Sequence, residues 1–188
     1  RESLRDDPGV QGRVMRAMGE AYTGLGLYPT AIPLLEEALP RLEKAYGRDT
    51  AIVYDALNEL GNFSNEISAF AAARGYFESA LDVALRVRGP DHGDVALIRR
   101  NLADACVNLG DLAAGRRHLE TTLELQTRLY GAESGAAAKS LSSLSGLEIK
   151  AGHPEVAVGL AERSLAIRLK RYGPAEPAVA FGRFALGE

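Results

Sequence analysis

Five asparagines are the residues of this chain whose type and spacing best fit a chemical role. Asn58, Asn62 and Asn65 are spaced by four and three residues, so they share one face of a helix, and Asn101 and Asn108 share a face of another. Asparagine is a mediocre helix former, which indicates that it is used here for its side chain. Its amide offers a donor and an acceptor, so it can bond both the N–H and the C=O of an extended peptide backbone. The alternative is a wet polar surface whose asparagines bond neighbouring helices.

Residues that carry catalysis or bind metals are few and scattered. The histidines, His92, His118 and His153, have no spacing that would assemble a nucleophile, a base and an orienting acid. Cys106 and His118 are too isolated for a zinc site, which needs about four ligands at recognisable spacing. No glycine-rich phosphate loop is present, because every glycine cluster falls at an expected helix end. We therefore predict no catalytic, metal-binding or cofactor-binding residues and no enzymatic activity.

Composition disfavours two further classes of function. The formal net charge of −3 argues against nucleic-acid binding, because phosphate binding usually shows as a basic face. No apolar run approaches the ~18 residues expected of a membrane span, and the chain starts without a signal-peptide pattern. We predict a cytoplasmic location, or an extracytoplasmic one if a membrane span precedes Arg1.

A fixed period organises the elements that must position these side chains. Glycines recur every 42 residues, and an apolar track and a leucine track keep the same interval. The three tracks are Gly47, Gly89, Gly131 and Gly173; Met18, Leu60, Leu102, Leu144 and Leu186; and Leu39, Leu81, Leu123 and Leu165. Self-similarity at one period indicates one supersecondary unit that is repeated in tandem.

Each unit is predicted to form two helices joined by a tight turn. In the first unit, Asp7 can cap a helix that begins at Pro8, and Gly26 ends it. Pro29 begins the second helix, and Tyr46-Gly47 stops it. The turns between the helices of the later units are expected at Asn65–Ser68, Gly110 and Gly152.

Residues of the first unit match a known repeat signature. They are Met18-Gly19, Tyr22, Gly26, Tyr28, Ala31, Leu35 and Ala38. This pattern resembles the tetratricopeptide repeat family, whose unit usually has 34 residues, and the 42-residue form with a Tyr-Gly stop is similar to the kinesin light chain variant. The resemblance implies an all-α fold, a right-handed α-solenoid of tandem helix-turn-helix units. It departs at Ser64 and Glu148, which replace the aromatic residue, and at Ser68, which replaces the turn glycine.

The resemblance covers nearly the whole chain, which we predict to be a single array. Four units span residues 6–47, 48–89, 90–131 and 132–173. Residues 1–5 match the tail of a preceding unit, and residues 174–188 match part of the first helix of a fifth. Solenoids need polar caps at their ends, so the uncovered apolar residues predict end-to-end self-association. These residues are Val179, Phe181, Phe184 and Leu186.

The resemblance also implies where a ligand would lie. In tetratricopeptide arrays the first helix of each pair lines the concave side, and ligands bind there. Carried over to this chain, the predicted groove residues are Arg16, Glu20, Asn58, Asn62, Asn65, Arg100, Asn101, Asp104, Asn108 and Lys139. The five asparagines would then hold a peptide without reading much of its sequence.

One specific ligand of the family does not fit these positions. Chaperone-binding members clamp a C-terminal carboxylate with two asparagines and three cations. The corresponding places here hold Asn62, Asn101 and Lys139, but Asn58 and Ser143 stand where two of the cations should be. Charge-assisted capture of a terminal carboxylate would therefore be much weakened.

We predict a non-catalytic protein-interaction scaffold that binds an extended peptide or a partner helix in its groove. The alternative is a regulatory or sensory segment of a larger bacterial signalling protein. Residues 6–39 look like the arrays attached to bacterial serine/threonine kinases and transcription regulators. A third interpretation, self-assembly through the outer faces, needs an exposed apolar patch that the pattern alone does not reveal.

Overall fold

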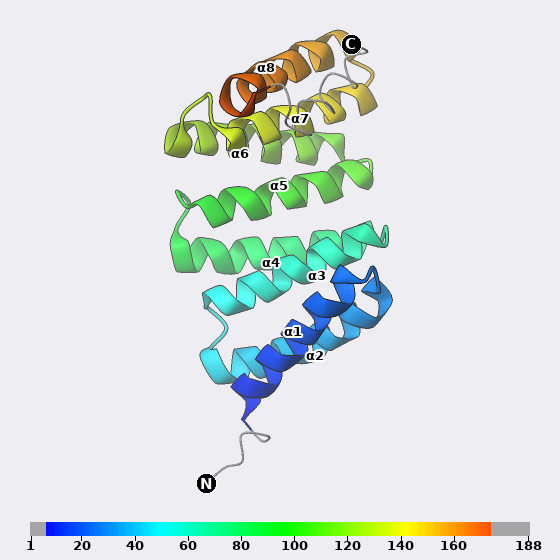
Figure 1. Ribbon diagram of the computed structural model, residues 1–188, viewed down its shortest axis with the longest axis vertical. Helices are drawn as coiled ribbons and strands as arrows, with labels where there is room; N and C mark the ends of the chain where they lie inside the picture. Colours follow the sequence, from blue (N-terminus) through cyan, green and yellow to red (C-terminus); the bar gives the residue numbers. More distant parts are fainter. Residues whose placement is uncertain (1–6, 174–188) are drawn as a thin grey trace. The chain divides into compact units, whose positions relative to one another are not determined.

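The computed structural model describes residues 7–173, and the regular elements among them are all α-helices (Figure 1). The helices are α1 (Pro8–Gly24), α2 (Tyr28–Tyr46), α3 (Ala51–Glu66), α4 (Phe70–Arg88), α5 (Gly93–Asn108), α6 (Leu112–Tyr130), α7 (Gly135–Lys150) and α8 (Pro154–Tyr172). The predicted all-α fold of tandem helical repeats is confirmed. The predicted tail at residues 1–5 and the fifth-unit helix at residues 174–188, with its four apolar residues, lie outside the described residues.

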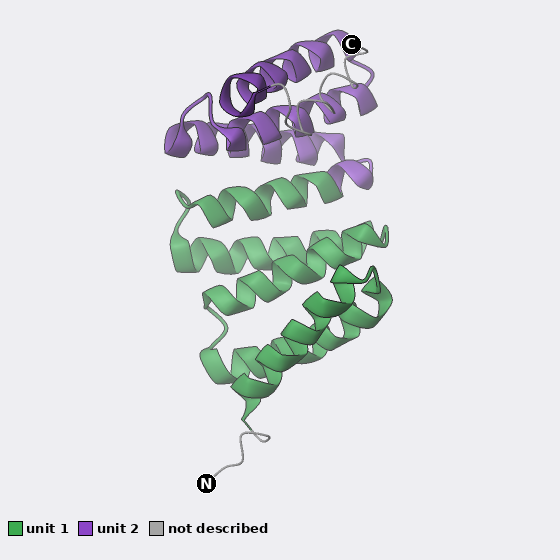
Figure 2. Ribbon diagram, viewed as in Figure 1, with its two compact units in different colours: residues 1–105 green, residues 106–188 purple. Residues whose placement is uncertain are grey.

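The chain divides into two compact units, residues 1–105 and 106–188, and the boundary falls within α5 (Figure 2). In the first unit α1 packs on α2, α2 on α3, and α3 on α4. In the second unit α6 packs on α7, and α7 on α8. The helices keep the period of the sequence, since α3, α5 and α7 each have 16 residues and begin at Ala51, Gly93 and Gly135.

The helix ends follow the local chemistry of the sequence. The Asp7 side chain caps α1 as predicted, because its Oδ1 accepts from the N–H of Gly9 at 2.7 Å and of Val10 at 3.3 Å. The four periodic glycines end α2, α4, α6 and α8 with φ between 77° and 88°. Their ψ angles of 155° to 173° lie in a region that is essentially restricted to glycine.

The turns inside the repeats need a left-handed residue. Gly26, Gly110 and Gly152 supply it with φ of 74°, 84° and 81°. Ser68 takes the same place with φ of 60°, and it is the one non-glycine residue with positive φ in the described part of the chain. A side chain in this conformation costs roughly 1–2 kcal/mol, so the turn between α3 and α4 carries a local strain.

The core of the first unit is built where α2 meets α3. Leu35, Ala38 and Leu42 of α2 pack on Ala56 and Leu60 of α3, and all five are fully buried. Full burial of each leucine contributes about 1.5–3 kcal/mol. These positions form the apolar stripe that the helical spacing predicts.

Large and small residues alternate where paired helices approach. A Cβ added to Gly61 would lie 2.4 Å from the Phe77 ring, so only glycine fits there. The equivalent residue of the fourth repeat, Ser145, is also buried and donates its hydroxyl to the Ala157 carbonyl at 2.8 Å. Small residues at this position therefore let the first helix of a repeat sit close to the second.

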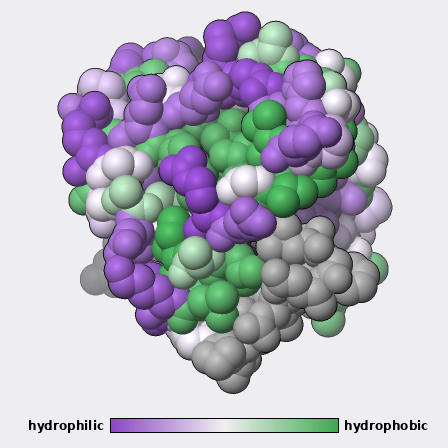
Figure 3. All heavy atoms as spheres, turned by 90° about the horizontal axis from the view of Figure 1, so that it is seen from above, coloured by the Kyte–Doolittle hydropathy of each residue, from purple (hydrophilic) through white to green (hydrophobic). Residues whose placement is uncertain are grey.

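Some apolar side chains remain at the surface. On α8, Val156 is 53% exposed and Val158 47% exposed. The space-filling view from above shows hydrophobic surface gathered in the middle of the face that it draws, with hydrophilic side chains around it (Figure 3). Exposed apolar surface of this kind is what the sequence pattern alone does not reveal. None of the helices within residues 7–173 combines the length and the apolar character that crossing a membrane requires.

Candidate functional site

Three of the predicted asparagines of the first unit meet between α3 and α5. Asn101 Nδ2 donates to Asn58 Oδ1 at 3.0 Å and to Asn62 Oδ1 at 3.2 Å. Arg100 Nη2 in turn donates to Asn101 Oδ1 at 3.4 Å. Three of the five asparagines thus bond across neighbouring helices, as the alternative interpretation of these residues expects.

The same cluster leaves polar atoms without a protein partner. Asn65 Oδ1 and Arg100 Nε are buried and make no hydrogen bond with the described residues. The amides of Asn58 and Asn62 use only their oxygen atoms in the cluster, so their N–H groups stay unbonded within the described part of the chain. A buried polar atom without a partner costs about 1–3 kcal/mol, and both atoms are enclosed by the protein, so the folded chain itself bears this cost.

The neighbouring contact between α1 and α3 is charged. Arg16 Nε donates to Glu59 Oε1 at 3.1 Å and Oε2 at 2.9 Å, and Arg16 Nη2 also bonds Glu59. Glu20 lies 3.5 Å from Arg16 Nε and is more exposed. Burial raises the pKa of Glu59; the bond to Arg16 opposes this rise, whereas the nearby Glu20 and Asp55 add to it. Burial likewise raises the pKa of Asp55.

The charged contact and the amide contact occupy the same positions of the repeat. Arg16 and Glu59 are 43 residues apart, and so are Asn58 and Asn101. Asn58 lies 42 residues after Arg16, so the second contact is the first one moved by one repeat. The register between successive first helices is therefore held by a side-chain pair whose chemistry changes from repeat to repeat.

The predicted groove residues of the second unit are not brought together. Asn108 is exposed, and its Oδ1 accepts from Lys150 Nζ at 2.9 Å. Lys139 is exposed as well, and Asp104, in the first unit, is half-buried. The observed cluster therefore consists of Asn58, Asn62 and Asn101 with Arg100 beside it, and the roles of Asn108 and Lys139 stay predictions.

Sequence reasoning missed a buried charge in the second unit. The Glu148 side chain is 3% exposed; it forms an ion pair with Arg116 of α6 and lies 2.9 Å from His153 Nδ1. The bond from Arg116 lowers the pKa of Glu148, and the bond to His153 acts in the same direction. The sequence does contain a signal for this buried charge, because Glu148 occupies the repeat position that Tyr22 occupies in the first repeat.

A second missed cluster joins α3, α4 and α5. The buried Tyr54 donates its hydroxyl to Asp94 Oδ2 at 2.5 Å and accepts from Arg88 Nε at 3.0 Å. The Asp94 N–H donates to His92 Nδ1 at 3.1 Å. Burial raises the pKa of the Tyr54 hydroxyl, and its bond to Asp94 raises it further. Every member has a partner within the unit, so this cluster is structural.

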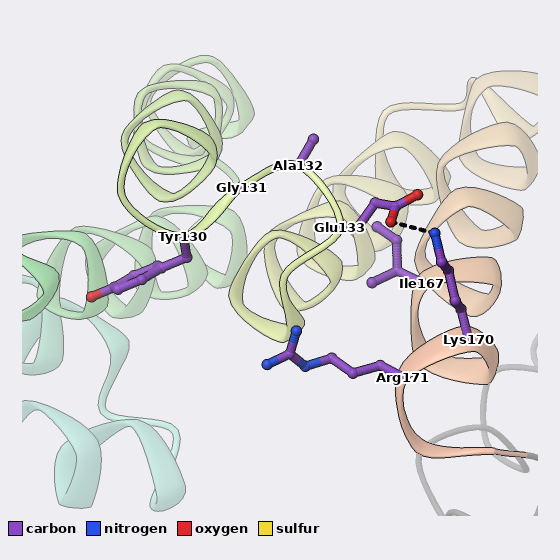
Figure 4. A pocket seen from close by; sticks show the side chains of 7 residues that line it. All are labelled: Tyr130, Gly131, Ala132, Glu133, Ile167, Lys170 and Arg171. Carbon is purple, nitrogen blue, oxygen red and sulfur yellow. Dashed lines mark hydrogen bonds and ion pairs between the residues drawn. The ribbon is translucent and has the colours of Figure 1, made fainter.

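The second unit also contains an open pocket of about 530 Å³ (Figure 4). Its lining residues are Tyr130, Gly131, Ala132, Glu133, Ile167, Lys170 and Arg171. Glu133 and Lys170 are joined by an ion pair of 2.5 Å, and the Arg171 side chain extends away from α8. None of the predicted groove residues lines this pocket. Within residues 7–173, no group of three or more histidine, cysteine or acidic side chains is placed to hold a metal ion.

Helix pairs repeated in tandem, with polar side chains that link successive first helices, define a helical-repeat protein. Tetratricopeptide repeat families match residues 13–51, 52–114 and 94–170, so the chain belongs to the tetratricopeptide repeat family. Proteins of this family generally mediate protein–protein interactions and act as non-catalytic scaffolds.

Solved structures agree with this assignment. BtubC (BKLC) from P. vanneervenii has a TM-score of 0.81 and 23% identity, over 98% of this chain and 74% of that protein. A putative kinesin light chain with nearly identical repeats from Podosopora anserina has a TM-score of 0.80 and 19% identity, over 96% of this chain and 85% of its own. At these identities the likeness concerns the fold. No curated protein matches the sequence.

Proposed function

We propose that the first unit binds an extended peptide along α3 and α5, over the cluster of Asn58, Asn62 and Asn101. The observation that carries this proposal is the amide cluster itself, in which the half-buried Asn58 and Asn62 are bonded through their oxygens only. Their N–H groups are left to bond a ligand. A peptide laid over the cluster supplies the acceptors.

The free hydrogen-bonding groups suit a peptide backbone. The N–H groups of Asn58 and Asn62 are donors, and each can bond a backbone carbonyl. Each such bond contributes about 0.5–1.5 kcal/mol net, so the pair orients a peptide without selecting its side chains.

The arrangement of the asparagines also supports this role. In the amide cluster, Asn101 uses both of its amide hydrogens to hold the oxygens of Asn58 and Asn62. This fixes the two side chains with their N–H groups free. A donor pair that is held in place before binding loses less entropy when a ligand arrives.

The test uses Asn58→Ala, because this half-buried side chain is bonded through its oxygen only. Peptides that bind the chain are first selected from a random display library, and their affinities are then measured by fluorescence polarisation. The variant is expected to stay folded and to bind the selected peptides about tenfold more weakly, as loss of one good hydrogen bond requires. A residue that only links α3 to α5 would change the stability and leave the peptide affinity unchanged.

The double substitution Asn62→Ala and Asn101→Ala removes the amide cluster itself, and we expect it to abolish peptide capture. Its matched control is Glu120→Ala with Glu124→Ala, two exposed residues of α6. Circular dichroism shows whether each variant is folded. The proposal is wrong if no library peptide binds the chain, or if the bound peptides do not distinguish Asn58→Ala from the wild type.

A further inference from the structure

Two side chains of opposite charge flank the cluster of Asn58, Asn62 and Asn101. Asp55 is exposed and lies on α3, about one turn before Asn58. Arg100 is half-buried and lies on α5, directly before Asn101. Residues three or four apart share one face of a helix, so Asp55 faces the same side as the asparagines of α3. The cluster therefore has a carboxylate on one helix and a guanidinium on the next.

No cation of the described chain is bound to Asp55. The arginines whose charge acts on it are Arg16 and Arg88. Arg16 is held by both carboxylate oxygens of Glu59, and Arg88 donates to the Tyr54 hydroxyl at 3.0 Å. Asp55 itself makes no hydrogen bond or ion pair with another residue of 7–173. Its carboxylate is therefore available to a cation from outside the chain.

Arg100 lacks the carboxylate that an arginine at its repeat position receives elsewhere. Two repeats earlier, Arg16 of α1 binds Glu59, which lies 43 residues later in the sequence. The residue 43 positions after Arg100 is Ser143, which carries no charge. Arg100 makes one long hydrogen bond, from Nη2 to Asn101 Oδ1 at 3.4 Å, and no ion pair with the residues that the structure describes. This unmet charge belongs to an inner repeat, so it does not depend on where the chain begins.

An extended peptide spans the distance between the two charges in a few residues. Asn101 bonds both Asn58 and Asn62, so it lies at a level between them. Arg100 is therefore about 6 Å further along the helix direction than Asp55, at 1.5 Å rise per residue. Neighbouring helices are about 10 Å apart, which gives a separation of about 12 Å. An extended chain advances about 3.3 Å per residue, so about three or four residues bridge it.

We propose that the peptide bound over the amide cluster carries two opposite charges. A lysine or arginine pairs with Asp55, and an aspartate or glutamate about three or four residues away pairs with Arg100. This inference rests on the proposed function. The asparagines bond the backbone of any peptide, whereas the two charges select among side chains and set the direction in which the peptide lies. A peptide with the reverse order of charges brings like charges together at both ends of the cluster, which disfavours it.

The peptides selected from the random display library provide the first test. They are expected to share a basic and an acidic residue about three or four positions apart, always in the same order. If the library yields no binder, the proposed function fails and this inference is overturned with it. If peptides bind and depend on Asn58 but share no such pair of charges, only this inference is overturned.

The second test reverses the charge of Asp55, an exposed residue whose side chain bonds no other part of the described chain. Asp55→Lys is expected to weaken the binding of a selected peptide about tenfold, because a repulsion replaces an attraction. A peptide with glutamate in place of its basic residue is expected to recover the loss. The matched control is Glu124→Lys, the same change of charge at an exposed residue of α6, and it is expected to leave both affinities unchanged. Equal affinities of Asp55→Lys and the wild type for both peptides overturn the proposal.

The third test removes the charge of Arg100 and keeps a polar side chain. Arg100→Gln is expected to weaken the binding of a selected peptide about fivefold, as loss of a partly exposed ion pair requires. It is expected to leave unchanged the affinity for a peptide whose acidic residue is replaced by glutamine, because that pair is already absent. Circular dichroism shows whether the variant is folded. An equal loss of affinity for both peptides shows that Arg100 acts through Asn101 alone and overturns its role in recognition.

Discussion

Two carboxylates, one in each compact unit, are bound to an arginine of a neighbouring helix and differ in the groups around them. Glu59 in the first unit is bound by Arg16, and Glu148 in the second by Arg116. Glu59 shares its arginine with Glu20 and lies near Asp55, so acids outnumber cations around it. Glu148 instead has a second hydrogen-bond donor, His153.

The difference teaches that burial alone does not set the charge state of these groups. The side chain of Glu148 is the more buried, at 3% exposure against 20% for Glu59. The pKa of Glu148 is nevertheless lowered by its bond to Arg116, whereas the pKa of Glu59 is raised by burial with help from neighbouring acids. At Glu148 the bonds to Arg116 and His153 outweigh burial, whereas at Glu59 burial outweighs the bond to Arg16.

The largest effect is expected from Glu148→Gln. The amide keeps the shape of the side chain, but it cannot accept from Arg116 and His153 as a carboxylate does. Hydrogen bonds to charged groups are worth about 1.5–3 kcal/mol, so we expect the free energy of unfolding to fall by about 2 kcal/mol at pH 7. Urea unfolding measures this. The control is Glu162→Gln, an exposed residue of α8, which is expected to change nothing.

The pH dependence of stability is expected to separate the two carboxylates. The pKa of Glu148 in the folded chain lies below its ordinary value of 4.5, so its stabilisation is complete above pH 4.5 and is lost as the pH falls through the folded pKa. The pKa of Glu59 lies above 4.5, so ionised Glu59 costs stability at neutral pH, and this cost disappears as the pH falls toward 4.5.

Urea unfolding of the wild type and the two glutamine variants between pH 7 and pH 3 checks this. Glu148→Gln is expected to remove the loss of stability that occurs as the pH falls below about 4.5. Glu59→Gln is expected to remove the rise in stability that occurs as the pH falls from 7 toward about 4.5. Parallel curves for the three proteins would contradict the comparison.

A smaller effect is expected from Glu59→Gln at pH 7. Arg16 loses its charged partner, but the crowding of acids around it is relieved at the same time. These effects oppose each other, so we expect the free energy of unfolding to change by less than about 1 kcal/mol, as is usual for partly exposed pairs. Glu66→Gln, on the exposed end of α3, is the matched control. A loss as large as that of Glu148→Gln would show that charge balance does not distinguish the two sites.

The smallest effect is expected where a carboxylate is exposed. Tyr76 donates its hydroxyl to Glu36 at 2.6 Å, and burial together with this bond raises the pKa of Tyr76 to about 12. The bond stabilises the chain below pH 10 and is lost as the pH rises through about 12. Tyr76→Phe is expected to cost about 0.5 kcal/mol and to remove the highest step from an absorbance titration of the tyrosines. A titration that keeps this step would assign it to another tyrosine.

The fold could be predicted from the sequence because local chemistry repeats at a fixed interval. Asp7 caps α1, and the periodic glycines end the second helices, because few other residues perform these tasks. The face shared by Asn58, Asn62 and Asn65 also follows from helical spacing. What spacing cannot give is the partner on another helix, such as the bond from Asn101 that takes up the oxygens of the first two.

The ion pair of the buried Glu148 could not be predicted from the sequence for a related reason. Glu148 and Arg116 are 32 residues apart and meet only because α6 packs on α7. Tyr54 likewise stands where the other repeats have Gly12, Ala96 and Ala138, so its bond to Asp94 has no counterpart in the repeat pattern. Positions that depart from the repeat are the places where reasoning from periodicity failed.

The shared backbone geometry of the four periodic glycines has a consequence for how such a chain changes over time. Gly47, Gly89, Gly131 and Gly173 have nearly equal dihedral angles, and 42 residues separate each from the next. A duplication or deletion that runs from one of them to another rejoins the chain at an identical conformation. Genetic recombination can therefore lengthen or shorten the protein by whole repeats, and the new connection keeps the backbone conformation of the existing ones.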